Sequence, residues 1–266
     1  MTTHLTVTSA EQVTPEVRRL WFRSDDLSAF AESRFTDRYV KLVFPRPGVD
    51  YPTLDMRELR RSIPAEDLPV VRTYTALFPD VAAGTLAIDF VVHGDEGVAG
   101  PWAAAAQPGD TLLVNGPGGA YRPDADADWH LLVGDESAMP ALTAALADLA
   151  ERAPDAVVRV VLLVEGPDSE PALELPPGAE LTVVHRSSGG SIVEAVRALE
   201  WLPGRVHAFV HGEAEETMHG LRPYLKERGL ARDQLSISGY WRRGRSEDGF
   251  REWKRDLAAS EEDPAS

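Results

Sequence analysis

The sequence predicts an antiparallel β-barrel followed by a parallel-sheet α/β domain of the nucleotide-binding kind. Up to about residue 100, short segments rich in β-branched and aromatic residues follow one another without a convincing long helix, which is typical of an antiparallel barrel. After residue 130, short apolar strands alternate with helical segments. This order predicts a parallel sheet with right-handed crossovers.

The stretch between the two halves, residues 121–129, is acidic, contains proline and has no periodicity, so it predicts the linker. The 266 residues are enough for two compact domains. We therefore predict a β-barrel domain over residues 1–122, an α/β domain over residues 130–258, and a small, acidic, disordered tail over residues 259–266.

The barrel strands are predicted from local composition. Segment 38–44 alternates in hydrophobicity until Pro45 ends it. The connection that follows, residues 45–69, contains several prolines and a glycine and is long enough for a short helix. Its arginines are expected on a solvent-exposed face. The glycines of residues 116–119 predict a tight loop that closes the barrel. The other predicted strands are 17–22, 71–75, 84–93 and 111–114.

The second half lacks the Gly-x-Gly-x-x-Gly fingerprint of dinucleotide folds. Ligands of parallel sheets nevertheless bind at the carboxyl ends of the strands. The strand that starts at His130 reaches such an end in the turn that finishes with Ser137. The other predicted strands are 157–164, 181–185, 206–210 and 235–239, and the predicted helices are 138–152, 191–199, 213–228 and 247–257.

Composition excludes several classes of function. The chain has no cysteine, which excludes disulfides, thiolate nucleophiles, iron–sulfur ligation and cysteine zinc sites. Its formal net charge of −16 argues against nucleic acid or an anionic membrane as a partner. We expect a cytosolic protein, because no apolar stretch is long enough to span a bilayer and the N-terminus has no signal-peptide pattern. The sequence has no metal-ligand spacing of histidines and no Ser-His-Asp pattern, so redox chemistry would need a bound organic cofactor.

Residues 71–75 read Val-Arg-Thr-Tyr-Thr and suit a flat, anionic cofactor. Side chains alternate along a strand, so Arg72 and Tyr74 are expected on one face, and Thr73 and Thr75 on the other. Tyr74 can lie against an aromatic ring, Arg72 can meet a phosphate, and the hydroxyls can meet ring heteroatoms. Such a motif is also common on ordinary barrel strands, so its weight comes from the motifs that follow it.

A glycine-bearing loop, residues 93–100, runs into an alanine-rich helix. Pro101 suits the first helical turn, where its missing N–H costs nothing. A helix entered through glycines leaves backbone N–H groups that favour a pyrophosphate. An ordinary capped helix is the simpler alternative for this loop taken by itself.

The last predicted strand runs into Gly-Tyr-Trp-Arg-Arg-Gly-Arg, residues 239–245, and then into a polar helix that carries Lys254. This is the one dense positive patch of an acidic sequence. Its basic residues either complement the acidic residues of their own helix or attract an anionic ligand. The Tyr-Trp pair directly before the arginines favours a ligand.

Together these motifs resemble those of the siderophore-interacting flavoproteins, ferric-siderophore reductases related to the ferredoxin–NADP reductase superfamily. The motifs are residues 72–75, 89–94, 97–102 and 239–244, and the resemblance runs from about residue 4 to residue 256. It implies an FAD-binding barrel and an α/β domain for the electron donor. Leu77 stands where the family often has a second arginine, which would contact a phosphate or the flavin.

The resemblance implies a role for each motif. Arg72, Tyr74 and Thr75 would hold the isoalloxazine and its phosphates, and Trp241 would cover or edge the flavin. Arg186 follows a strand and could meet a 2′-phosphate, although a solvent-exposed strand end is the simpler reading. The residues expected to bind FAD are Arg72, Thr73, Tyr74, Thr75, Asp89, Val91, His93, Ala99, Gly100, Pro101, Trp102 and Trp241. Those expected to bind the nicotinamide donor are Gly134, Asp135, Glu136, Ser137 and Arg186.

We therefore expect a cytosolic, FAD-dependent ferric-siderophore reductase with NADPH, NADH or a ferredoxin as donor. No catalytic side chain or resident metal is expected, because the flavin carries the chemistry. A general NAD(P)H:flavin or electron-transfer oxidoreductase and a non-enzymatic siderophore-binding flavoprotein are the alternatives. Ferric siderophores are commonly anionic, so basic side chains are expected to steer the chelate. These are Lys41, Arg122, Arg242, Arg243, Arg245 and Lys254.

Overall fold

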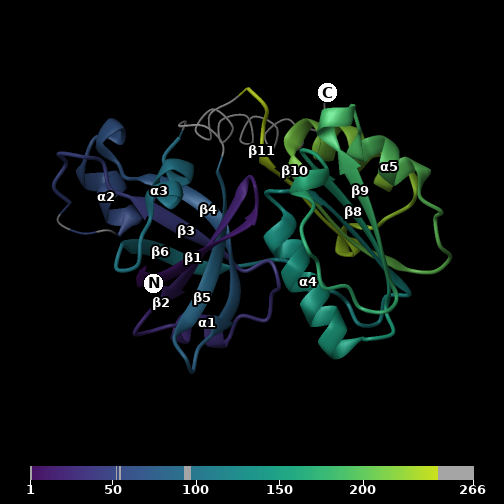
Figure 1. The fold of residues 1–266 in the computed structure, drawn as a ribbon, viewed down its shortest axis with the longest axis horizontal. Helices are drawn as coiled ribbons and strands as arrows, with labels where there is room; N and C mark the ends of the chain where they lie inside the picture. Colours follow the sequence, from purple (N-terminus) through teal and green to yellow (C-terminus); the bar gives the residue numbers. More distant parts are fainter. Residues whose placement is uncertain (1, 52, 54, 93–96, 245–266) are drawn as a thin grey trace. The chain divides into compact units, whose positions relative to one another are not determined.

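The computed structural model of the chain describes residues 2–51, 53, 55–92 and 97–244 (Figure 1). Internal contacts divide the chain into two compact units. The first comprises Met1–Pro123, Pro140–Pro154 and Pro167–Pro176, and the second comprises Asp124–Met139, Asp155–Gly166 and Pro177–Ser266. The domain bounds proposed from the sequence remain a prediction. Within the described ranges, no helix combines the length and the apolar character needed to cross a bilayer.

The first unit contains a closed antiparallel barrel, which confirms the predicted class. Its strand order is β1-β2-β5-β4-β3-β6, and the pairing of β1 with β6 leaves no free edge. β1 is absent from the predicted strands, although its buried residues Thr3, Leu5 and Val7 alternate as a strand requires. The strands are β1 (Thr2–Thr14), β2 (Val17–Arg23), β3 (Tyr39–Phe44), β4 (Val70–Asp80), β5 (Thr85–Val91) and β6 (Thr111–Gly118).

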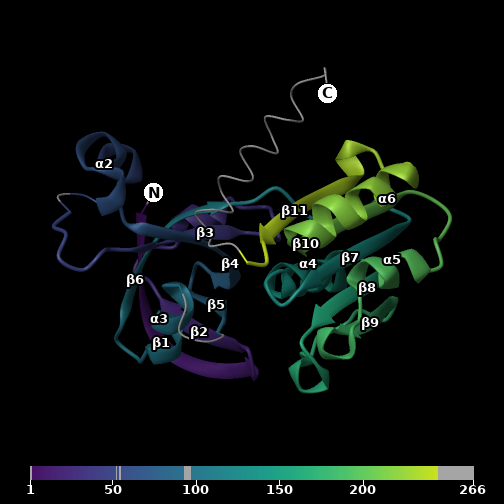
Figure 2. The same cartoon turned by 90° about the horizontal axis from the view of Figure 1, so that it is seen from above.

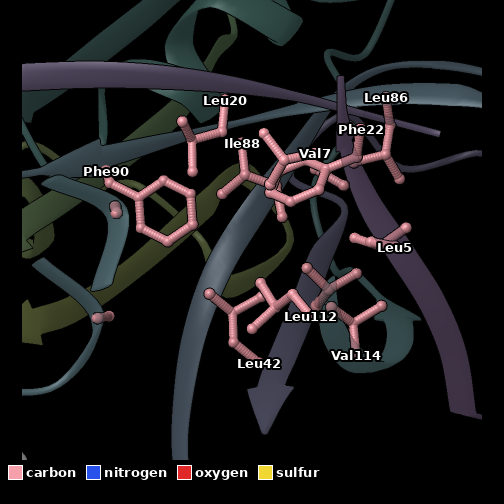
Figure 3. Close-up of a cluster of buried hydrophobic side chains, with 14 of the residues drawn as sticks. Leu5, Val7, Leu20, Phe22, Leu42, Leu86, Ile88, Phe90, Leu112 and Val114 are labelled. Atoms are coloured by element: carbon pink, nitrogen blue, oxygen red, sulfur yellow. The ribbon is translucent and has the colours of Figure 1, made fainter. Parts of the chain in front are cut away.

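Alternate residues of the strands fill the barrel (Figure 3). Leu86, Ile88 and Phe90 of β5 point into the interior, where they join Leu20 and Phe22 of β2, and none of the five is exposed. Burial of a large apolar side chain stabilises a fold by about 1.5–3 kcal/mol. The interior of the barrel is therefore the main source of stability for this unit.

Short helices connect the barrel strands, and one of them lies in the excursion 45–69, as predicted. This helix begins after Asp55 because the Asp55 carboxylate accepts the backbone N–H groups of Arg57 and Glu58, at 2.7 and 3.2 Å. The helical segments of the unit are α1 (Ser28–Ala31), α2 (Met56–Ser62), the 3₁₀ segments η1 (Ala65–Asp67) and η2 (Pro167–Ser169), α3 (Ala99–Ala105), and all of α4 (Met139–Arg152) except its first residue.

β6 runs further than predicted. It extends to Gly118, so the prediction of a tight closing loop over residues 116–119 is wrong for the first part of that stretch. Two aromatic residues explain Gly118 and Gly119. A Cβ atom on Gly118 would lie 2.3 Å from the Tyr39 ring, and one on Gly119 would lie 2.5 Å from Phe35. The glycines therefore make room for packed rings rather than for a turn.

Buried aromatic residues lie at both ends of the predicted linker. Tyr121 is buried, and the Asp37 carboxylate accepts the N–H groups of Ala120 and Tyr121, each at 2.9 Å. Trp129 is also buried, as the first residue of β7 (Trp129–Asp135). Both aromatic residues are thus part of packed structure, which their acidic neighbours in the sequence concealed.

Replacing Asp37 by alanine should lower the free energy of unfolding by about 2–4 kcal/mol, because two backbone donors beside a buried tyrosine lose their acceptor. Asp37→Asn, which keeps an acceptor oxygen, should cost less than half as much. Urea unfolding measures both, with exposed Asp25→Ala as the control. Equal stability of Asp37→Ala and Asp25→Ala would contradict this role of Asp37.

The second unit contains a five-stranded parallel sheet in the order β11-β10-β7-β8-β9, which confirms the second part of the predicted class. β7 lies at its centre and is buried along its whole length. Because all strands run the same way, their carboxyl ends meet at one edge of the sheet. The remaining strands are β8 (Val157–Val164), β9 (Ala179–His185), β10 (Val206–Glu213) and β11 (Leu235–Trp241).

Helices α5 (Ile192–Ala198) and α6 (Arg222–Glu227) lie alongside the sheet and contribute Ile192, Val196 and Leu225 to its core (Figure 2). The predicted helix 213–228 begins later than expected, because Glu213 ends β10. A π-helical segment, η4 (Glu215–Leu221), precedes α6. The remaining helical segments are η3 (Arg186–Ser188) and η5 (Arg232–Gln234). The predicted helix 247–257 and tail 259–266 lie outside the described residues.

Candidate functional site

β4 presents its two kinds of side chain on opposite faces. Tyr74 packs, with Val70 and Ala76, against the core of the barrel. Thr73 is exposed on the other face, and Arg72 is half-buried. The Tyr74 ring and the Thr73 hydroxyl, although adjacent in sequence, therefore lie on opposite faces of the strand, as alternation requires.

Tyr74 belongs to a cluster of four aromatic rings. The Tyr74 and Phe90 ring centroids are 4.8 Å apart, and those of Phe90 and Trp102 are 5.9 Å apart. Phe44 meets Trp102 edge-on at 6.0 Å. Phe44 and Phe90 are buried, whereas Tyr74 and Trp102 are partly exposed. Two partly exposed rings on a rigid aromatic base suit contact with a planar heteroaromatic group.

The outward face beside this cluster is polar. In β3, Lys41 lies opposite Thr73, and Tyr39 lies opposite Thr75. Among the described residues, the hydroxyls of Thr73 and Thr75 have no hydrogen-bond partner, and Lys41 has no ion pair. The Thr73 hydroxyl and the Lys41 ammonium group are exposed and therefore available to a polar or anionic ligand, whereas Thr75 is buried.

The first turn of α3 lies close to β5, and this close approach depends on Gly100. A Cβ atom at Gly100 would lie 3.3 Å from the carbonyl oxygen of Val91, so glycine allows the helix to approach the strand. Pro101 lies in the first turn, and the N–H of Trp102 donates to the Val98 carbonyl at 3.1 Å. Ala99 is buried. His93, which precedes this helix, lies outside the described residues.

Asp89 and Val91 lie on the outer side of β5, because Ile88 and Phe90 face the core. The Asp89 side chain is 1% exposed, and both of its oxygens accept hydrogen bonds from Arg19 of β2, at 2.6 and 2.8 Å. A contact between Asp89 and FAD stays a prediction. Arg19 was missed by the sequence analysis, although it is one of a pair of arginines on a predicted strand.

Leu77 departs from the family pattern in a way that the fold explains. It is fully buried in β4. An arginine there would need either a buried partner or a different path for its side chain. Leu77 itself has no charged group with which to meet a phosphate.

At the carboxyl end of β7, Asp135 is 2% exposed. Ser137 donates to it through its backbone N–H at 2.9 Å and through its hydroxyl at 2.5 Å. Burial raises the pKa of Asp135, and the hydrogen bonds from Ser137 and Trp241 oppose that rise. Direct contact of Asp135 with the nicotinamide stays a prediction, since its carboxylate is engaged inside the unit. Gly134 is likewise buried, within β7.

Arg186, at the end of β9, is held by carboxylates from neighbouring strand ends. Its guanidinium donates to both oxygens of Glu136, at 2.9 and 3.0 Å, and to Glu165 at 3.3 Å. These hydrogen bonds, those to Glu136 first, raise the pKa of Arg186. A 2′-phosphate at Arg186 would have to compete with Glu136 and Glu165, which the sequence analysis did not identify as its partners.

Two of the basic residues predicted to steer an anion are already paired. Arg122 donates to Asp148 at 2.9 Å, and Arg242 donates to Glu215 at 3.0 Å. Burial alone would raise the pKa of Asp148, but hydrogen bonds from Arg152 and Arg122 hold it below its ordinary value. Arg245 and Lys254 lie outside the described residues.

Arg243 lies at a pocket of about 310 Å³ that acidic residues share with it. Burial raises the pKa of Glu216 in this pocket, and the nearby charges of Glu213 and Asp135 raise it further. The arginines here therefore sit among carboxylates and do not form a purely positive surface. The pocket is lined by Glu213, Glu215, Glu216, Arg242 and Arg243.

The chain matches two family models in succession. The siderophore-interacting FAD-binding domain covers residues 6–121, and the siderophore-interacting protein domain covers residues 127–244. The chain belongs to the siderophore-interacting protein family. The resemblance noted from the sequence motifs is thereby confirmed.

Relatives in this family extend over nearly the whole chain. An uncharacterised protein of Mycobacterium tuberculosis is 46% identical, over 96% of this chain and 95% of that protein. The ferric vibriobactin reductase of Vibrio cholerae is 31% identical, over 94% of this chain and 92% of that enzyme. A siderophore utilization protein from T. fusca has 35% identity and a TM-score of 0.76, covering 92% of this chain and 94% of that chain.

The fold extends beyond the siderophore-interacting proteins. The ferredoxin reductase of carbazole 1,9a-dioxygenase has a TM-score of 0.68 at 17% identity, covering 90% of this chain and 68% of that chain. This similarity shows a shared fold, a barrel followed by a parallel sheet.

The residues of the barrel fit the FAD that the family domain binds. Tyr74 and Trp102 provide partly exposed aromatic surface, and Thr73 and Thr75 provide hydroxyls without partners among the described residues. Arg72 is half-buried next to them on β4. This combination of rings, hydroxyls and a cation matches an isoalloxazine joined to phosphates.

Removing the carboxylates that hold Arg186 should increase the affinity for a 2′-phosphate. The double variant Glu136→Gln/Glu165→Gln should bind 2′,5′-ADP about tenfold more tightly than the wild type, because the guanidinium no longer has to leave two ionised partners. Its affinity for 5′-AMP should change little. Isothermal titration calorimetry measures both ligands.

The matched control is Glu200→Gln/Glu227→Gln, which removes two exposed carboxylates elsewhere on the second unit. If both double variants gain the same affinity, the effect belongs to net charge and not to Arg186. If neither gains any, Arg186 does not face the ribose phosphate.

Proposed function

We propose that this protein is an FAD-dependent reductase that takes electrons from NADPH or NADH and reduces ferric siderophores, which releases iron as Fe(II). The observation that carries the proposal is the donor set on β4, where Tyr74 joins an aromatic cluster and Thr73 and Thr75 offer hydroxyls. The names of two relatives support it. One is the ferric vibriobactin reductase, and the other is an NADPH-dependent ferric-chelate reductase of Escherichia coli, 38% identical over 56% of this chain and 58% of that enzyme.

Bound FAD supplies hydride acceptance and the passage of single electrons. The role of the protein in this reaction is to hold the cofactor in position. Tyr74 and Trp102 would lie against the ring system, Arg72 would balance phosphate charge, and Thr73 and Thr75 would donate to heteroatoms. No side chain has to act as a general acid or base, which agrees with the absence of such a pair from the sequence motifs.

The donor would bind at the carboxyl end of the parallel sheet, where Gly134, Glu136, Ser137 and Arg186 lie on or after β7 and β9. A reduced ferredoxin is the alternative donor. We place the reaction in the cytoplasm, where reduced nicotinamide dinucleotides are made. The substrate is the ferric chelate, and its reduction weakens the bonds between iron and hard oxygen ligands.

Lys41 is the basic residue best suited to meet an anionic chelate. It is exposed, lies opposite Thr73 in the strand register, and has no ion pair among the described residues. A net charge of −16 on the chain would otherwise repel an anion, so an unpaired ammonium group beside the flavin contacts would increase the rate of encounter. Arg122, Arg242, Arg243, Arg245 and Lys254 are further candidates for this role.

The first test is an anaerobic visible spectrum of the purified protein, followed by NADH or NADPH and then by a ferric siderophore. Flavin bands that bleach with a nicotinamide and return with the chelate are the expected result. Bands that persist with both nicotinamides would indicate a ferredoxin-type donor. A protein that stays colourless and does not take up FAD would overturn the proposal.

Charge reversal of Lys41 should separate chelate reduction from other flavin chemistry. Lys41→Glu should raise the KM for an anionic ferric siderophore about fivefold, because attraction becomes repulsion next to the site. Reduction of an uncharged dye should keep its rate. The matched control is Lys226→Glu on α6, an exposed lysine with the same change of charge.

The two alternatives give different results in the same assays. A general NAD(P)H:flavin or electron-transfer oxidoreductase would reduce dyes, and the Lys41 variant would turn over ferric siderophores as the wild type does. A non-enzymatic siderophore-binding flavoprotein would bind the chelate but would not reduce it with NADH, NADPH or a ferredoxin.

A further inference from the structure

Two histidines lie side by side on neighbouring strands of the parallel sheet. His130 of β7 is paired with His207 of β10 in the strand register, and the centroids of their imidazole rings are 6.3 Å apart. His130 is 1% exposed and His207 is 9% exposed. Burial disfavours the charged form of an imidazole, and two neighbouring cations repel each other, so this site favours neutral rings.

One ring nitrogen of His207 accepts a hydrogen bond from the backbone. The N–H of Asp124 donates to Nδ1 of His207 at 3.1 Å. A ring nitrogen can accept such a bond only if it carries no proton, because both nitrogens of a protonated imidazole are donors. The observed contact therefore requires a neutral His207 with its proton on Nε2. Protonation of Nδ1 would set two N–H groups against each other and break the bond.

This hydrogen bond attaches the entry segment, residues 124–128, which begins the second unit and leads into β7. The segment is also attached to Arg205, directly before β10. The Arg205 guanidinium donates to the Asp124 carboxylate at 2.6 Å, and the Arg205 backbone N–H donates to the Asp128 carboxylate at 2.5 Å. Carboxylates and guanidinium groups keep their charges near neutral pH, whereas an imidazole has an ordinary pKa of about 6.5. The bond to His207 is therefore the attachment that responds to mild acid.

The charged groups around His207 act in opposite directions. Burial lowers the pKa of His207 and the charge of Arg205 adds to this, whereas the carboxylates of Asp124 and of Asp233 in η5 oppose it. The hydrogen bond from Arg205 lowers the pKa of Asp124, so that carboxylate stays ionised. His130 faces the ring from β7. Since the pKa of His207 is lower in the folded protein than in a detached chain, the attachment is complete above pH 6.5 and weakens as the pH falls below that value.

We propose that His207 is a pH-sensitive latch, which holds the entry segment on β10 at neutral pH and releases it in mildly acidic solution. The latch is the hydrogen bond from the Asp124 N–H to Nδ1, and its trigger is a proton on that nitrogen. Release frees the residues that lead into β7, the central strand, so order at this end of the sheet depends on pH. The device belongs to the second unit alone and does not depend on the proposed function.

The test is hydrogen exchange at the Asp124 amide of the full chain, measured between pH 7.5 and pH 5.5 and corrected for the intrinsic pH dependence of exchange. The protection factor should fall about five- to tenfold, because one pH unit below a pKa of about 6.5 a proton favours the detached form by up to about tenfold. The amide of Val160, inside β8, should keep its protection. An equal fall at both amides would indicate a general loss of stability and would overturn the proposal.

A conservative variant separates the proton from the contact. His207→Asn offers an amide oxygen as acceptor in place of Nδ1, and this oxygen takes up no proton near neutral pH. The variant should keep the Asp124 amide protected and abolish the pH dependence. His219→Asn, the same change at an exposed histidine of the second unit, is the matched control and should behave as the wild type does. If the pH dependence persists in His207→Asn, another group such as His130 is the trigger and the proposal is wrong.

A second measurement needs no substitution at His207, whose replacement could prevent folding. The ¹⁵N chemical shifts of the imidazole rings in the full chain report which nitrogen of each carries a proton. At pH 7.5, His207 should show a bare Nδ1 and a protonated Nε2, and it should take up its second proton over the same pH range in which Asp124 loses protection. A proton on Nδ1 at pH 7.5 would overturn the proposal, as would titration of His207 while the Asp124 amide stays protected.

Discussion

Alternation of side chains around the closed barrel is the constraint on which the first unit depends. Because every barrel strand is paired on both edges, each residue must face either the core or the outside. In β4 this places Tyr74 against Phe90 and leaves Thr73 on the outer face beside Lys41. One short segment can therefore offer an aromatic ring and a hydroxyl from fixed positions. A flavin needs both kinds of contact.

In the second unit, the parallel pairing of the strands is the corresponding constraint. It brings the carboxyl ends of segments that are distant in the sequence to one edge of the sheet. Asp135, Glu136 and Glu213 all lie there, and each accepts hydrogen bonds from a neighbouring strand end or helix start. Carboxylates in such positions order the backbone, but they also neutralise arginines. Arg186 and Arg242 are paired for this reason, so an acidic chain keeps little free positive charge at this edge.

Sequence reasoning succeeded where local pattern decides the outcome. The class of both units, the strand that carries Arg72 and Tyr74, and the place of Pro101 in a first helical turn all follow from composition and periodicity. It failed where packing overrides local signals. The sequence around Gly118 predicts a turn, but this glycine makes room for the Tyr39 ring. The acidic neighbours of Trp129 predict a linker, but this residue belongs to a buried strand.

The sequence by itself determined the order of a barrel and a parallel sheet, and the motifs that identify the family. Only the tertiary structure decided which polar side chains are free to bind ligands. Asp89 is held by Arg19, Arg186 by Glu136, and Trp241 by Asp135, across separations of 70, 50 and 106 residues. Local periodicity cannot predict such pairs, because they form only when folding brings distant strand ends together.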